Sequence, residues 1–129
     1  MKIKILIISF FVIALVSLCS FELIYSQKTL NEINNLSNEI IYLIESEDKQ
    51  SNNLTEKMND LYSKWNEDEH NLCLLYNHKD LLEIGKEINQ ALSYILIDNV
   101  KESYVHMLLL KEDLETLIQI VGFNTFNIF

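Results

Sequence analysis

Apolar residues follow two different patterns along the chain. Between Lys4 and Glu22 they dominate an unbroken run of 17 residues, Ile5–Phe21, that contains no charged side chain. Beyond Lys28 they recur every three or four positions, which places them on one side of a helix. The first pattern predicts a membrane segment, and the second predicts amphipathic helices that each bury one stripe.

The apolar run predicts an N-terminal membrane anchor over residues 1–25. At ~1.5 Å per residue the run is about 25 Å long, slightly less than a hydrocarbon core of ~30 Å. A snorkelling Lys4 and an interfacial Tyr25 would cover the difference. Because Lys2 and Lys4 both precede the run, we expect the N-terminus in the cytoplasm and residues 26–129 on the outer side.

Two other interpretations of this segment stay open. A cleaved signal peptide would use Ser17 and Cys19 as the small residues before the cut, although the sequence has no Ala-x-Ala there. A lipoprotein would be acylated at Cys19, but Leu18 stands where such signals carry Gly, Ala or Ser. We expect a retained anchor.

Four apolar stripes follow the anchor and are separated by polar breaks at Ser46–Gln50, Asn77-His78 and Asp98-Asn99. Gly122 stands where a left-handed C-cap would end the last helix. The polar stretch Asn66–Asn71 would either be exposed or bend its helix. The apolar positions expected in the core are Leu30, Ile33, Leu36, Ile40 and Ile44, then Leu54, Met58, Leu61, Trp65, Leu72 and Tyr76, then Leu81, Ile84, Ile88, Ala91 and Ile95, and finally Tyr104, Met107, Leu114, Leu117 and Val121.

The expected fold is therefore all-α. A single transmembrane helix over residues 1–25 precedes a small extracytoplasmic bundle of about four helices over residues 26–129, built as two stacked helical hairpins and ending in an aromatic tail.

Composition narrows the possible functions. The 129 residues include 2 Gly and no Pro, and the 10 basic residues, all Lys, are outnumbered by 19 acidic ones. So few turn residues argue against an all-β fold and against phosphate-cradling loops, and the acidity argues against nucleic acid as a partner. Beyond the anchor, 8 Lys stand against 18 acidic residues, a balance of −10. Such a surface keeps a domain soluble, or attracts a basic partner or divalent cations.

The densest set of candidate metal ligands is Glu67, His70, Cys73 and His78. Glu67 and His70 lie three positions apart on one helical face, but the second Glu-x-x-His pair of a di-iron bundle is missing. A zinc site would need a bend after Cys73, because His78 lies more than two helical turns from His70. We expect an exposed charged helix end, with no metal and no cofactor. Since no catalytic constellation is visible either, we expect no enzyme.

Five residues are candidates for contacts with a partner: Trp65, His78, Asp80, Phe126 and Phe129. Trp65 lies on an apolar stripe, where core packing is its ordinary role. His78 and Asp80 flank a predicted helix boundary. The tail that contains Phe126 and Phe129 would either fold back onto the bundle or dock on a partner.

Three short sequences carry a resemblance to a known family. They are Tyr62-Ser63-Lys64-Trp65, Asn77-His78-Lys79-Asp80 and the terminal Asn127-Ile128-Phe129. With the order of the predicted helices, they resemble the bacterial family called domain of unknown function 4363 over nearly the whole chain. Members more often carry Asp-His where this chain has Asn77-His78, which puts a carboxylate role at that position in doubt. The resemblance implies a short helical protein tethered to the bacterial cytoplasmic membrane, near multi-pass membrane proteins, and it implies no activity.

These observations predict a non-enzymatic accessory or interaction subunit of a membrane complex. It would bind lipid through its anchor and a multi-pass membrane protein through its bundle. The alternative is a sensor bundle that binds a ligand or divalent cations. Whether two copies pair as a homo-oligomer stays open.

Overall fold

The computed structural model describes residues 2–46 and 51–126, and within these ranges the regular structure is entirely helical. The helices are α1 (Lys2–Glu45), α2 (Ser51–Leu72), α3 (His78–Leu96) and α4 (Val100–Phe126). The prediction of an all-α chain is confirmed for this part of the protein.

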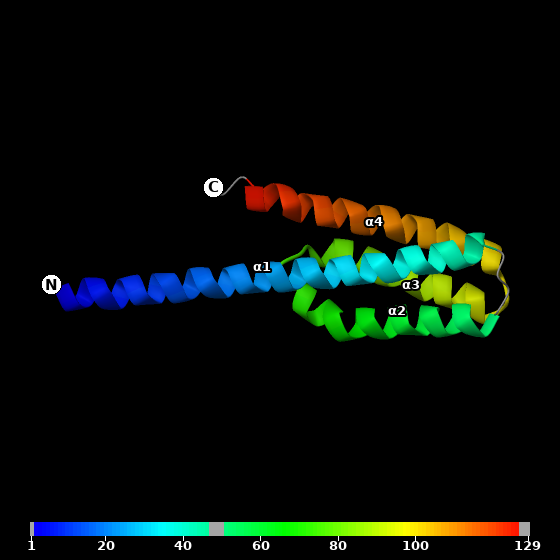
Figure 1. The fold of residues 1–129 in the computed structure, drawn as a ribbon, viewed down its shortest axis with the longest axis horizontal. Coiled ribbons are helices and arrows are strands. Elements are labelled where there is room, and N and C mark those ends of the chain that lie inside the picture. The colour runs from blue at the N-terminus through cyan, green and yellow to red at the C-terminus, as the bar shows by residue number, and fades with distance from the viewer. Residues whose placement is uncertain (1, 47–50, 127–129) are drawn as a thin grey trace.

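The four helices enclose one core. The second half of α1 packs against α2 and α4, and α3 packs against the same two helices from the other side. Successive helices run in opposite directions, so that the end of α4 lies on the same side of the bundle as the protruding first half of α1 (Figure 1). This is the up-down-up-down order of a four-helix bundle with short connections.

Helix α1 joins the predicted membrane segment to the bundle without a break. The sequence suggested an anchor up to Tyr25 and a separate helix from about Lys28, but α1 continues from Lys2 to Glu45. No Gly or Pro lies between Phe21 and Lys28 to interrupt it. The Ser26 hydroxyl donates to the Leu23 carbonyl oxygen within the helix at 2.9 Å. The predicted anchor segment and the first helix of the bundle are therefore one element.

The core contains the apolar stripes that the sequence predicts. All five positions expected on α3 are buried, and most of the others are buried or pack against the core from its edge. The structure adds Ile41 and Leu110 to this core, whereas the side chain of Val121 lies outside the described residues.

Polar residues lie at the helix boundaries where breaks were expected. Asn77 caps α3, because its Oδ1 accepts a hydrogen bond from the backbone N–H of Lys79 at 3.0 Å. Asp98 adopts a φ of 59° in the turn before α4, a left-handed conformation that Asp tolerates better than most residues. The prediction for Gly122 is wrong, since α4 runs through it to Phe126 and the glycine has no positive φ.

Candidate functional site

Two tyrosine hydroxyls connect α1 to α2 and to the α2–α3 turn, at the level where the apolar half of α1 leaves the bundle. The Tyr25 hydroxyl donates to Oδ1 of Asp68 on α2 at 3.3 Å. The Tyr76 hydroxyl, in the turn between α2 and α3, donates to Oγ of Ser26 at 3.2 Å. Burial raises the pKa of Tyr76, so this hydroxyl keeps its proton and remains a donor. These hydrogen bonds hold the C-terminal end of α2 and the following turn against one short segment of α1.

Lys64 completes this polar network. Its Nζ lies 2.9 Å from Oε2 of Glu32 on α1 and 3.0 Å from Oδ2 of Asp68 on its own helix. Hydrogen bonds to Glu32 and Asp68 raise the pKa of Lys64, and the bond to Lys64 lowers the pKa of Glu32. The ammonium group is therefore kept charged beside Asp68, which is 6 % exposed.

The burial of Asp68 differs from both expectations for the polar stretch Asn66–Asn71, which were that it would be exposed or would bend its helix. Residues Asn66–Asn71 belong to α2, which continues to Leu72, but Asp68 faces inward while Glu67 and His70 are exposed. The signal was present in the sequence. Asp68 follows Trp65 by three positions and precedes Leu72 by four, which places it on the buried stripe.

The candidate metal ligands are only partly brought together. Cys73 and His78 approach across the α2–α3 turn, with Sγ 3.7 Å from Nδ1. Glu67 and His70 do not join them in a metal-binding group: in the described part of the chain, no three His, Cys, Asp or Glu side chains gather in a way that could hold an ion.

The five interaction candidates lie in different environments. Trp65 is 1 % exposed and packs so closely on Gly85 of α3 that a Cβ there would lie 2.9 Å from the indole Nε1. It therefore presents no surface to a partner. His78 is exposed at the start of α3, where Asn77 rather than His78 provides the cap. Phe126 ends α4 but its side chain lies outside the described residues, as does the whole of Phe129.

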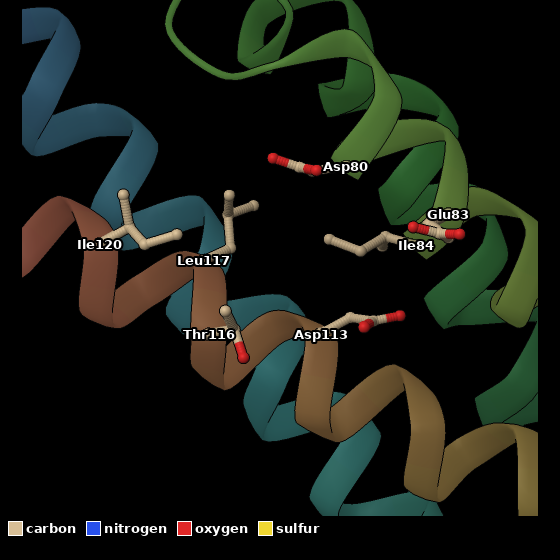
Figure 2. A pocket seen from close by; sticks show the side chains of 7 residues that line it. All are labelled: Asp80, Glu83, Ile84, Asp113, Thr116, Leu117 and Ile120. Carbon is tan, nitrogen blue, oxygen red and sulfur yellow. The ribbon is translucent and has the colours of Figure 1, made fainter.

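Asp80 belongs to an acidic hollow between α3 and α4. Figure 2 shows its lining, in which carboxylates from both helices lie next to apolar side chains from the same two helices. Burial raises the pKa of Asp113, and the nearby Glu83, Glu87, Glu112 and Asp80 raise it further. The residues that line the hollow are Asp80, Glu83, Ile84, Asp113, Thr116, Leu117 and Ile120. Sequence reasoning missed this arrangement, because the spacing within each helix does not reveal which residues meet across an interface.

A second acidic group is buried in the same interface. Glu87 on α3 is 5 % exposed, and its Oε2 lies 2.6 Å from Nδ1 of His106 on α4. Tyr94 stacks on the His106 ring with centroids 5.4 Å apart, and Lys86 Nζ lies 3.5 Å from the other Glu87 oxygen. Neither Glu87 nor His106 lines the acidic hollow. The pair joins α3 to α4 and has the character of a structural contact.

Exposed apolar side chains form continuous groups on α1 and on α4. The first half of α1 exposes them around its circumference, from Ile3 to Phe21. On α4, Val105, Leu108 and Leu109 are 46 %, 41 % and 44 % exposed. Their spacing of three and four positions makes them one outward stripe, which we call the α4 outer stripe.

Comparisons with protein-family models, with curated proteins and with solved structures find no match. The family resemblance of the sequence therefore stays a prediction, and the function has to be inferred from the residues themselves.

Proposed function

We propose that this chain is a membrane-anchored, non-enzymatic subunit of a membrane complex, whose bundle binds a multi-pass membrane protein on the outer side. The observation that carries the proposal is the division of α1. Its first half is apolar and exposed, and its second half is a core element of the bundle.

The first half of α1 needs an apolar environment. The helix is long and apolar enough to cross a membrane, and none of its most apolar window is buried in the fold. Leu6 and Phe10 are each 70 % exposed. Soluble monomers rarely expose contiguous apolar patches larger than a few hundred Å², so hydrocarbon is the environment that suits this segment.

The distribution of lysines supports the orientation. Lys2 and Lys4 flank the apolar half of α1 on its N-terminal side, and the next lysine is Lys28. Positive residues close to a membrane segment favour the cytoplasmic side, which puts the bundle outside.

The α4 outer stripe supports a role in binding. Val105, Leu108 and Leu109 form one exposed apolar stripe on α4, and an apolar helix of a partner could pack along such a stripe. Glu87 and His106, a carboxylate and an imidazole, are bonded to each other inside the bundle and do not line the acidic hollow. Both observations favour interaction over catalysis.

Affinity purification of the tagged full-length chain in mild detergent tests the proposal. We expect a stoichiometric multi-pass membrane protein to copurify. The triple variant Val105→Ser, Leu108→Ser, Leu109→Ser should lose it, whereas Ser63→Ala with Asn66→Ala, on the exposed side of α2, should retain it. A wild-type chain that purifies alone would overturn the proposal. A partner that copurifies equally well with the α4 triple variant would overturn it too.

A further inference from the structure

We propose that the end of the bundle nearest the apolar half of α1 rests directly on the membrane. Leu74 and Leu75 of the α2–α3 turn and the uncharged last turns of α4 would lie in its headgroup layer. We call this end of the bundle the membrane-proximal end. The inference rests on the proposed role of α1 as an anchor and adds a second, peripheral contact with the same lipid surface.

The first argument is the absence of a linker within α1. The apolar run ends at Phe21, and Ser26, five residues later in the same unbroken helix, already contacts the bundle. Five residues of helix rise only about 7.5 Å. A headgroup layer is about 5–7.5 Å thick on each side of the hydrocarbon core. Ser26 would therefore lie near the outer boundary of that layer.

The second argument is the position of the α2–α3 turn. The bond of 3.2 Å from the Tyr76 hydroxyl to Ser26 Oγ fixes the turn at the level of Ser26. The turn lies on the side of the bundle from which the apolar half of α1 protrudes (Figure 1). Leu74 is 71 % exposed and Leu75 is 40 % exposed. Two exposed leucines at this level are placed to enter the interface between headgroups and acyl chains.

The third argument is the distribution of charge. The chain is acidic overall, but the segment His70–Lys79 contains no Asp or Glu, and no residue after Glu115 is charged. The end of α4 reaches further toward the N-terminal end of α1 than the α2–α3 turn does (Figure 1). Ile120, on this part of α4, is 50 % exposed. Anionic lipids repel carboxylates. Glu69 and Asp80 flank the α2–α3 turn and Glu22 lies one helical turn before Ser26, so the stretches free of carboxylates are the turn itself and the last turns of α4.

The length of the apolar run strengthens the inference. Seventeen residues, Ile5–Phe21, span about 25 Å, which is about 5 Å less than a typical hydrocarbon core. Such a mismatch is met by thinning of the bilayer or by drawing flanking residues inward. Ile24, which is 68 % exposed, is the next apolar residue available. Either adjustment brings the α2–α3 turn closer to lipid.

Depth-dependent fluorescence quenching on the full-length protein in phosphatidylethanolamine–phosphatidylglycerol vesicles tests this contact. Single cysteines for an environment-sensitive dye would be placed by Leu74→Cys or Ile97→Cys, in a background with Cys19→Ala and Cys73→Ala. Ile97 is the matched control, because it is 69 % exposed in the turn at the opposite end of the bundle. We expect a nitroxide on the lipid headgroup to quench the dye at position 74 several-fold more than at position 97. Aqueous iodide should show the reverse order.

A third label separates the two proposals. Leu15→Cys places the dye within the apolar run, where Leu15 is 62 % exposed in the fold. Lipid quenching at 15 together with iodide quenching at 74 would overturn the headgroup contact and leave the anchor intact. Equal lipid quenching at 74 and 97 would also overturn it. Without lipid quenching at 15, the anchor itself would be wrong, and this inference would fall with it.

Discussion

At the scale of single residues, the attachment of α1 to α2 depends on how one buried carboxylate is neutralised. Asp68 is 6 % exposed, accepts a hydrogen bond from Tyr25 and pairs with Lys64. A buried charge is tolerated only when it is paired and hydrogen-bonded. Lys57 offers a natural comparison, since its Nζ also reaches a glutamate of α1, Glu39, at 2.9 Å, but no buried carboxylate depends on it.

Replacing Lys64 should therefore lower the free energy of unfolding more than replacing Lys57 does. Lys64→Met leaves Asp68 buried without its cation, so the free energy of unfolding should fall by about 1–3 kcal/mol. Lys57→Met removes a bridge of the same length between the same two helices, with a similar side-chain exposure of 35 % against 30 %, and should change stability much less. Chemical denaturation in detergent measures both. Equal losses would show that Asp68 does not depend on Lys64.

The close contact between Trp65 and Gly85 predicts a second effect. A Cβ at Gly85 would lie 2.9 Å from the buried indole ring, so Gly85→Ala should destabilise the fold despite the better helix propensity of alanine. The net loss should be on the order of 1 kcal/mol. In a Trp65→Phe background, which makes room for the methyl group, the same substitution should be neutral or favourable. A loss of equal size in both backgrounds would place its cause elsewhere.

At the scale of the helices, hydrophobic periodicity predicted most of the bundle. The positions expected on α3, from Leu81 to Ile95, are all buried, and Asn77 and Asn99 stand at helix starts as expected. Leu110 was missed because it follows Leu108 and Leu109, and three successive leucines do not show which one faces inward. The continuity of α1 was missed because Glu22 ends the apolar run but does not end a helix.

The candidate sites were predicted less well, because they depend on pairing between helices. The sequence grouped Glu67, His70, Cys73 and His78, and the structure brings only Cys73 and His78 to within 3.7 Å. The acidic hollow and the Glu87–His106 pair join residues of α3 to residues of α4. Their meeting depends on the register between the two helices, which no spacing along the chain specifies.

The acidic hollow predicts a pH dependence of the α3–α4 interface. Burial and the surrounding carboxylates raise the pKa of Asp113 in the folded chain. An acid whose pKa is raised on folding binds its proton more tightly in the folded state. The charged carboxylate therefore destabilises the fold at pH values above the raised pKa, and this destabilisation disappears as the pH falls toward the ordinary Asp pKa of about 3.9. Asp113→Asn should therefore raise the melting temperature at neutral pH, and the gain should shrink on acidification.

Glu69→Gln, which makes the same charge change on α2, is the control for this prediction. It should show neither the gain at neutral pH nor its loss on acidification. A gain for Asp113→Asn that is independent of pH would contradict the assignment of the effect to the charge of Asp113.

At the scale of the whole molecule, the two ends of the bundle differ. The membrane-proximal end carries exposed Leu74 and Ile120 and no carboxylate in the neighbouring segments His70–Lys79 and 116–126. The opposite end contains Glu45 and Asp98, but it also exposes Leu96 and Ile97, so exposed apolar side chains alone do not distinguish the two ends. Because the apolar half of α1 protrudes from the first end, the proposed anchoring would place the membrane-proximal end toward the membrane and the opposite end away from it.

Labelling of cysteines in intact cells tests this orientation most directly. In a background without Cys19 and Cys73, Ile97→Cys at the opposite end of the bundle should react with a membrane-impermeant thiol reagent before the cells are opened. Ile3→Cys, next to the N-terminal lysines, should react only after permeabilisation. If both cysteines react in intact cells, or both react only after lysis, α1 does not cross the membrane between them.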